Sequence, residues 1–167
     1  GKGISVAVID SGIDLSHPDL DVSYSTSLVD EEKDPNDYGG HGTHVSGIIG
    51  GKGNKIEEFK GIAPGCDLIN LKTFTKNGET TDYIVAKAIE IAIDFEVDVI
   101  NMSLGGMISK DSPLYKYTEI AVENGITAVV AAGNEGDSYY TITCPGTVPD
   151  AITVGATNKS NNSIAEY

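Results

Sequence analysis

Short apolar runs alternate along the chain with segments of helical periodicity, and this alternation limits the possible folds more than any other feature. The runs are rich in β-branched residues and almost wholly apolar, which is typical of strands that are buried on both faces of a parallel sheet. We expect five such strands, at 4–9, 67–72, 97–102, 127–132 and 151–156, and the segment 22–29 is a candidate for one more.

Three segments between these runs carry apolar residues at steps of three and four. One follows His41, one starts at Thr81 and one starts at Ser112, with Gly125 as a stop signal. The order strand, helix, strand predicts right-handed βαβ units. We therefore expect an α/β fold with a doubly wound, mostly parallel sheet flanked by helices, in one domain over residues 1–167.

The charge balance and the cysteines disfavour some classes of function. Eleven basic and 25 acidic residues give a formal net charge of −14, which disfavours nucleic acid as a partner because phosphates would be repelled. No apolar stretch approaches the roughly 20 residues of a membrane span. Cys66 and Cys144 show no metal-binding spacing, so we expect two free and mostly buried thiols.

Polar residues follow several of the expected strands, at the edge where open α/β sheets bind their ligands. Asp10 ends the first strand, and a carboxylate there needs a partner, for which a histidine is well suited. Asn134 follows the fourth expected strand, where its amide could donate to an oxygen that becomes negative during acyl transfer. Taken alone, each residue is better explained as part of a turn.

The segment HGTHVSG is more specific. Gly40 and Gly42 flank His41, which permits a tight start of a helix and the close approach of a substrate. His44 follows three residues later, whereas two zinc-binding histidines of an HExxH helix are four apart with a glutamate between them. A metal site is therefore disfavoured, and we expect His44 to be a buried helix residue whose ring donates to the backbone.

Several motifs in order resemble the signature blocks of the subtilisin-like serine proteases along the whole chain. They are VAVIDSGID with SHPDL, GGHGTHVSG, GIAPG, VINMSLGG, VVAAGNEG and CPGTVPDAITVGAT. The resemblance implies that Asp10 is the acid of an Asp-His-Ser triad, His41 the general base and Asn134 the oxyanion donor. It also implies that residues 1–167 are the N-terminal and central part of a serine endopeptidase domain.

The family's nucleophile lies in a motif resembling Gly-Thr-Ser-Met-Ala, and the 167 residues contain no such motif. We therefore expect the nucleophile in sequence beyond Tyr167, and we expect the 167-residue chain alone to be inactive. The implied partners are polypeptide substrates, the remaining C-terminal part of the domain and an inhibitory prosegment. The resemblance favours an extracellular or cell-envelope location, although intracellular relatives exist.

By the same resemblance, two backbone edges hold an extended peptide between them, with pockets for its side chains beside them. Glu79, Asp82 and Glu135 are expected near the cleft, which suggests tolerance of basic substrate side chains. The residues expected to bind substrate are Phe74, Gly78, Glu79, Thr80, Ser103, Leu104, Gly105, Ala131, Ala132, Gly133 and Glu135.

The chemistry requires no cofactor, but the resemblance implies a structural calcium ion. Asp19 and Asn54 would supply side-chain oxygens, and Gly51, Ile56 and Glu58 would supply main-chain oxygens. The loop is slightly longer than the commonest family form, and a solvated turn without an ion is the alternative. Cys144-Pro145 occupies the place of a cis peptide bond in the family.

Two other classes of function are alternatives to the endopeptidase. A pseudoprotease would keep the peptide cleft as a binding or scaffold module, and the presence of Asp10, His41 and Asn134 together argues against it. A nucleotide-binding α/β domain is weaker, because the glycine-rich segments form neither GxGxxG nor GxxxxGK[ST].

Overall fold

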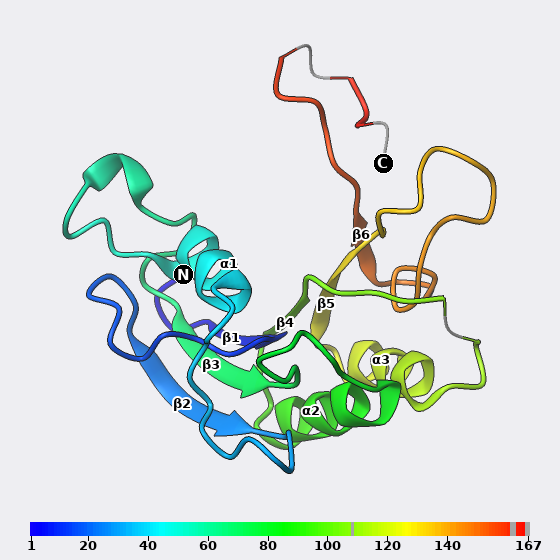
Figure 1. Ribbon diagram of the computed structural model, residues 1–167, viewed down its shortest axis with the longest axis horizontal. Helices are drawn as coiled ribbons and strands as arrows, with labels where there is room; N and C mark the ends of the chain where they lie inside the picture. The colour runs from blue at the N-terminus through cyan, green and yellow to red at the C-terminus, as the bar shows by residue number, and fades with distance from the viewer. Residues whose placement is uncertain (108, 161–162, 166–167) are drawn as a thin grey trace.

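The computed structural model describes residues 1–107, 109–160 and 163–165, and its centre is a parallel sheet (Figure 1). The strand order is β2-β3-β1-β4-β5-β6, and every neighbouring pair is parallel. This confirms the predicted fold class. The strands are β1 (Ser5–Asp10), β2 (Val22–Ser27), β3 (Asp67–Lys72), β4 (Val99–Met102), β5 (Thr127–Ala131) and β6 (Ile152–Val154).

Helices cover both faces of this sheet. Helix α1 (His41–Gly50) lies on one face, and α2 (Asp82–Asp94) and α3 (Pro113–Glu123) lie side by side on the other (Figure 1). A short 3-10 helix, η1 (Glu57–Phe59), follows α1. The expected caps are present, because Thr81 accepts from the backbone N–H of Ile84 and Ser112 accepts from that of Tyr115.

The candidate strand at 22–29 exists as β2, whereas β4 and β6 are shorter than expected. Val97 is buried but precedes β4 instead of opening it. Asp98 lies between Val97 and the start of β4, and its carboxylate accepts hydrogen bonds from the backbone N–H and the hydroxyl of Ser5.

Strand β1 has β3 and β4 as neighbours, and its two faces belong to different parts of the core. Val6 and Val8 pack in the cluster beneath α1, whereas Ala7 and Ile9 pack in the larger cluster with α2 and α3. Because side chains alternate along a strand, Asp10 faces the α1 side. The sheet therefore directs a carboxylate that is only 2% exposed toward the start of α1.

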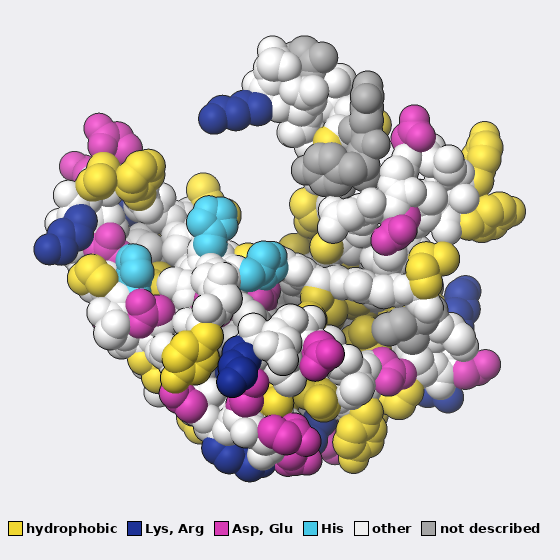
Figure 2. Space-filling view, in the orientation of Figure 1, with side chains coloured by type: hydrophobic (Ala, Val, Ile, Leu, Met, Phe, Trp, Pro, Cys, Tyr) yellow, Lys and Arg dark blue, Asp and Glu magenta, His cyan; other side chains and the backbone are white. Residues whose placement is uncertain are grey.

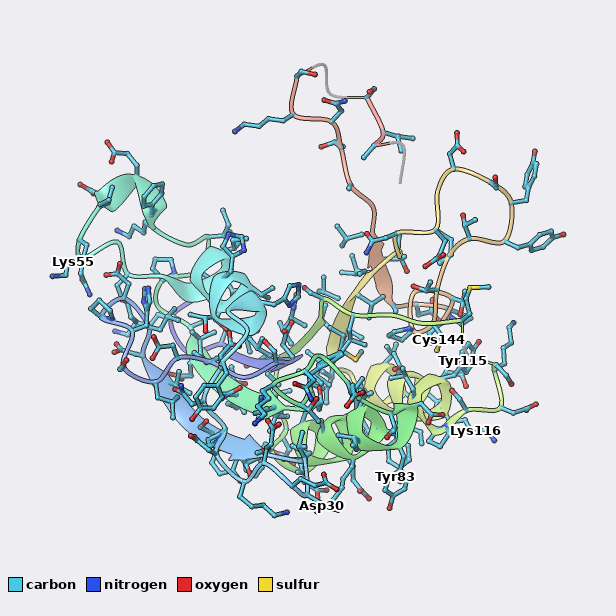
Figure 3. All side chains as sticks on the ribbon, in the orientation of Figure 1. Asp30, Lys55, Tyr83, Tyr115, Lys116 and Cys144 are labelled. Atoms are coloured by element: carbon cyan, nitrogen blue, oxygen red, sulfur yellow. The ribbon has the colours of Figure 1, made fainter. Side chains whose placement is uncertain are left out.

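Both cysteines are free and buried, as the sequence predicts. Cys144 lies in the same core cluster as Tyr115 of α3 (Figure 3), and its peptide bond to Pro145 is cis. Burial raises the pKa of the Cys66 and Cys144 thiols. Within the described residues, no helix has the length and apolar character needed to cross a membrane.

Candidate active site

A cleft of about 540 Å³ opens where strands β1, β3, β4 and β5 end. Figure 2 shows histidine side chains exposed on the hollowed face of the molecule. The cleft contains all three of the predicted catalytic residues. Its lining consists of Asp10, Ser11, Gly39, His41, Lys72, Phe74, Thr75, Lys76, Asn77, Gly78, Ser103, Leu104, Gly105 and Asn134.

Asp10 and His41 form a direct hydrogen bond in this cleft. The Nδ1 atom of His41 lies 2.7 Å from the Oδ1 atom of Asp10, which also accepts from the backbone N–H of Ser11 at 2.7 Å. A carboxylate only accepts hydrogen bonds, so Nδ1 carries the proton and Nε2 is left free to take one. The Asp10 side chain is 3% exposed and that of His41 is 60% exposed, so the imidazole is anchored from below and open to the cleft.

The start of α1, which carries His41, is held by the carboxylate of Asp37. One oxygen of Asp37 accepts from the backbone N–H groups of Gly39 and Gly40, at 3.0 and 2.9 Å. The other accepts from the N–H of Thr43 at 2.9 Å and from its hydroxyl at 2.7 Å. Gly40 has the left-handed φ of 87° at the N-cap and provides no side chain, so Asp37 takes over the capping.

Asp37 also ties this helix to the end of β1. The hydroxyl of Ser11 donates to Asp37 at 3.0 Å and accepts from the backbone N–H of Gly42 at 2.9 Å. Burial raises the pKa of the Asp37 carboxyl, but the hydrogen bonds from Thr43, Gly40 and Ser11 outweigh it and leave the pKa below its ordinary value. Asp37 is not among the residues predicted from the sequence. An acidic residue four positions before His41, ahead of two glycines, was the available signal.

Gly42 allows the helix to approach the strand closely. A Cβ atom at this position would lie 2.2 Å from the carbonyl oxygen of Gly12 and 3.1 Å from the Cβ of Asp10. A larger residue would push the helix away, and His41 with it. The glycine therefore fixes the distance across which Asp10 and His41 meet.

The far wall of the cleft carries Asn134, which follows β5 and is exposed, together with the turn 103–105 after β4. Gly105 of this turn and Gly133, which precedes Asn134, both pack closely on the buried residue Thr143. A Cβ at Gly105 would lie 2.3 Å from the Thr143 hydroxyl, and one at Gly133 would lie 2.7 Å from it. Thr143, 3% exposed, thus supports both segments, and sequence reasoning did not identify it.

The structure brings part of the expected substrate-binding set into this cleft. Phe74, Gly78 and the turn 103–105 line it, whereas Glu79 and Thr80 do not. Thr80 instead donates its hydroxyl to the carbonyl of Thr73 at 2.7 Å, so it stabilises the loop rather than the cleft surface. Ala131 is the last residue of β5, and a separate cavity of about 150 Å³ is lined in part by Ala132, Gly133 and Glu135.

The charge at the cleft differs from the expectation. Glu79, Asp82 and Glu135 do not line it, and Lys72 and Lys76 do. The tolerance of basic side chains, which was inferred from acids near the cleft, stays a prediction.

The expectation that His44 is buried is wrong. The buried positions of α1 are Gly42, Ser46 and Gly50, four residues apart, so small residues face the sheet and position 44 lies on the outer side. His44 is exposed and lines a second cavity, of about 850 Å³, together with Tyr38 and Ile48. It does not belong to the cleft.

Asp19 and Asn54, the proposed calcium ligands, lie next to each other. The backbone N–H of Asn54 donates to Asp19 Oδ1 at 2.7 Å, and the Asn54 amide nitrogen donates to the carbonyl of Pro18 at 3.1 Å. These bonds close the loop, and neither of them uses Asp19 Oδ2 or the side-chain oxygen of Asn54. No group of three or more His, Cys, Asp or Glu side chains suited to a metal occurs among the described residues, so calcium, which prefers oxygen ligands, would depend on main-chain oxygens.

Comparison with known proteins identifies the family to which this fold belongs. The model of the subtilase family matches residues 1–167, and the chain belongs to that family. It is 44% identical to subtilisin E of Bacillus subtilis (strain 168) over 164 residues, which are 96% of this chain and 42% of that protein. It is 39% identical to an intracellular serine protease of Paenibacillus polymyxa over 168 residues, or 95% of this chain and 51% of that protein.

A solved structure agrees with this assignment. The crystal structure of a cold adapted subtilisin-like serine proteinase matches with a TM-score of 0.81 at 30% identity, covering 94% of this chain and 56% of that chain. The chain therefore spans about half, or less, of the length of these proteins.

Proposed function

We propose that this chain supplies the acid, the base and one oxyanion donor of a serine endopeptidase, and that its nucleophile lies in polypeptide beyond residue 167. The observation that carries the proposal is the 2.7 Å hydrogen bond between Asp10 and His41, at the floor of a cleft that also holds Asn134. Membership of the subtilase family supports it.

Each residue then has one task in acyl transfer. The Nε2 atom of His41 takes the proton of the serine hydroxyl as its oxygen bonds to the peptide carbonyl carbon, and later gives that proton to the leaving amine. Asp10 holds the ring in the required tautomer and stabilises the imidazolium. The amide of Asn134 donates to the oxygen that becomes negative in the tetrahedral intermediate.

The peptide substrate would lie extended between the two walls of the cleft. The segment that contains Phe74 and Gly78 forms one wall and the turn 103–105 forms the other. Main-chain hydrogen bonds to such walls bind a peptide as an added strand with little regard to its sequence.

A fluorophosphonate, which modifies activated serines, tests the proposal in a longer polypeptide that continues past Tyr167. We expect labelling of one serine beyond residue 167, loss of labelling in His41→Ala, and no labelling or peptide hydrolysis by the 167-residue chain alone. His44→Ala is the matched control, because His44 is an exposed histidine of the same helix outside the cleft.

Two results would contradict the proposal. Equal labelling of the His41→Ala variant would mean that His41 is not the base. A folded longer polypeptide with no labelled serine would indicate a module that only binds peptides.

We further propose that Asp19 and Asn54 contribute to a structural calcium site. Their adjacency supports this proposal, as do Asp19 Oδ2 and the Asn54 side-chain oxygen, which take no part in the hydrogen bonds from Asn54 to Asp19 and Pro18. The ion would have no part in the chemistry and would brace the loop that follows α1.

A further inference from the structure

Lys72 is a buried cation that the proposed reaction does not use. It ends β3, is 1% exposed and is the only buried lysine among the described residues. Burial of an ammonium group is costly unless polar partners compensate for the lost water. Its Nζ atom donates to the carbonyl oxygen of Ser11 at 2.7 Å and lies 3.9 Å from the carboxylate of Glu32.

The first of these partners, Ser11, directly follows Asp10, the proposed acid of the triad. Lys72 is the register partner of Asp10 in the parallel pair β1–β3, and neighbouring strands lie about 4.8 Å apart. The residue that receives the Lys72 hydrogen bond, Ser11, donates its own N–H to the same Asp10 oxygen that contacts His41. Lys72 therefore holds the residue whose N–H orients Asp10, through the carbonyl of the next peptide group.

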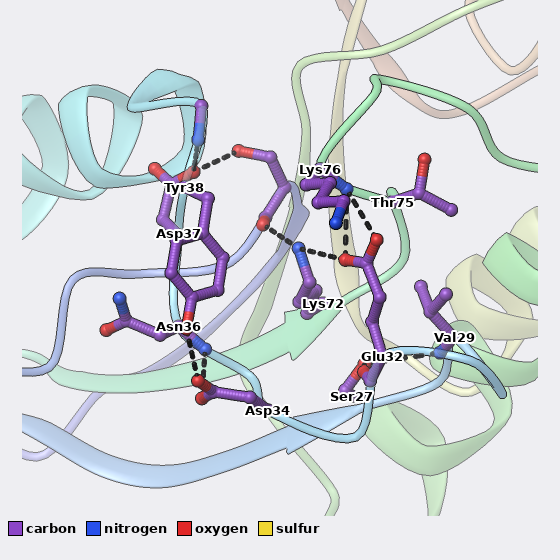
Figure 4. Close-up of polar contacts among 12 residues, drawn as sticks. Ser27, Val29, Glu32, Asp34, Asn36, Asp37, Tyr38, Lys72, Thr75 and Lys76 are labelled. Carbon is purple, nitrogen blue, oxygen red and sulfur yellow. Dashed lines mark hydrogen bonds and ion pairs between the residues drawn. The ribbon is translucent and has the colours of Figure 1, made fainter.

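The second partner, Glu32, also contacts the segment that forms one wall of the cleft. Both carboxylate oxygens of Glu32 lie within hydrogen-bond distance of the backbone N–H of Lys76, at 3.1 and 3.0 Å (Figure 4). Lys76 belongs to the wall formed by residues 74–78, which would bind the substrate backbone. Glu32 is thus placed between the buried cation and this wall.

We infer that Lys72 and Glu32 form a positioning pair that couples the Asp10–His41 hydrogen bond to the substrate-binding wall at 74–78. The inference rests on the proposed function and adds two positioning residues to it. The Nζ atom of Lys72 reaches the residue that follows Asp10 on one side and Glu32 on the other. One charged pair would then align the base and the substrate edge together.

Proton NMR of the protein tests this coupling without any nucleophile. In Lys72→Met, we expect the downfield Nδ1 proton signal of His41 to be displaced or lost. We also expect the amide of Lys76 to exchange with solvent at least about tenfold faster, since Glu32 loses its fixed partner. Glu32→Gln should move the same two signals, the Lys76 amide more strongly.

Lys52→Met is the matched control. Lys52 likewise donates to a backbone carbonyl, that of Pro64 at 2.7 Å, and lies 3.3 Å from the carboxylate of Asp21, but it does not line the cleft. This variant should leave both signals unchanged.

The inference is overturned if Lys72→Met changes only one of the two signals, the His41 Nδ1 proton or the Lys76 amide. It is also overturned if Lys52→Met changes both signals to the same extent. Should Lys72→Met fail to fold, Glu32→Gln decides, because it keeps the buried cation and must still move the His41 signal. Lys72→Arg, which retains the charge, should restore part of both signals. A negative result here would leave the fluorophosphonate labelling intact, so it is distinct from failure of the proposed function.

Discussion

His41 Nδ1 lies 2.7 Å from Asp10 Oδ1, although the two residues are 31 positions apart in the sequence. Asp10 comes from the end of β1 and His41 from the first position of α1, so their meeting depends on how closely this helix packs on the strand. Asp37, Ser11 and Gly42 each act on that packing. The hydrogen bond is therefore a sensitive measure of the local fold.

Asp10→Asn should preserve the shape of the site and remove its ability to select the His41 tautomer. An amide can donate to Nδ1 as well as accept from it, so the ring can carry its proton on Nε2. In that tautomer Nε2 cannot take the proton of the serine hydroxyl. In the longer polypeptide, we expect the rate of fluorophosphonate labelling to fall on the order of 10⁴-fold, the cost of this substitution in a Ser-His-Asp triad. Asp14→Asn is the control, because Asp14 is bonded to Ser16 outside the cleft, and a loss of less than about tenfold in Asp10→Asn would contradict the assigned role.

Two glycines of α1 should respond to alanine in opposite ways. At Gly42 the new Cβ would lie 2.2 Å from a backbone oxygen, and the helix must move, so we expect a loss of about 2–4 kcal/mol in the free energy of unfolding. At Gly47 a Cβ would meet nothing within 4 Å, and alanine should stabilise the protein by about 0.5–1 kcal/mol. Urea denaturation measures both, and equal effects would show that the two positions are packed alike.

These helix positions also show where the sequence stops being informative. The buried strands could be predicted because their apolar runs are a local signal, and Asp10 and His41 because motifs flank them. The outward position of His44 could not be predicted, since the fully buried positions of α1 are small residues and its apolar Val45 and Ile49 are only partly buried against the core. A pattern of apolar side chains does not identify such a face.

The polar network around the cleft could not be predicted from the sequence for a different reason. Lys72 and Ser11 are 61 positions apart, and Lys76 and Glu32 are 44 apart. Such contacts follow from strand order and register, which periodicity in the sequence does not specify. Lysine at the end of an apolar run resembles the polar end of any strand, and only the register with β1 shows that it lies beside Asp10.

Asp37 should make the stability of the protein depend on pH. Because its pKa in the folded state lies below the ordinary value of 3.8, the unfolded chain binds a proton more readily. Its contribution is present above that value and is lost as the pH falls through the lower pKa of the folded state. At pH 7 Asp37→Ala should cost about 2–4 kcal/mol, since five donors lose a charged acceptor.

Denaturation of the Asp37→Ala variant and the parent protein over a range of pH isolates this effect. The difference in stability should shrink in acid, whereas a difference that is constant down to the lowest pH would assign Asp37 a purely steric role. Asp34→Ala, at an exposed position of the same loop, should cost much less at pH 7.

Calcium should raise the thermal midpoint of the protein if Asp19 and Asn54 contribute to a site. A ligand that binds only the folded state stabilises it by about 2.7 kcal/mol at a concentration of 100 times its Kd. The shift should be absent in Asp19→Ala and retained in Asp21→Ala, where the lost carboxylate is a neighbour that pairs with Lys52. An equal shift in all three proteins would refer the effect to another part of the surface.

The two thiols should be inert until the protein opens. Burial raises the pKa of both Cys66 and Cys144, so at pH 8 each has less of the reactive thiolate than a free cysteine, and each is shielded from the reagent. We expect Ellman's reagent to detect neither thiol in the native protein and both in denaturant. Ser138→Cys places a thiol at an exposed position and should react at once, which controls for the reagent. Because Cys66 packs with the cluster beneath α1 and Cys144 with α2 and α3, one rapidly reacting native thiol would show which face of the sheet opens first.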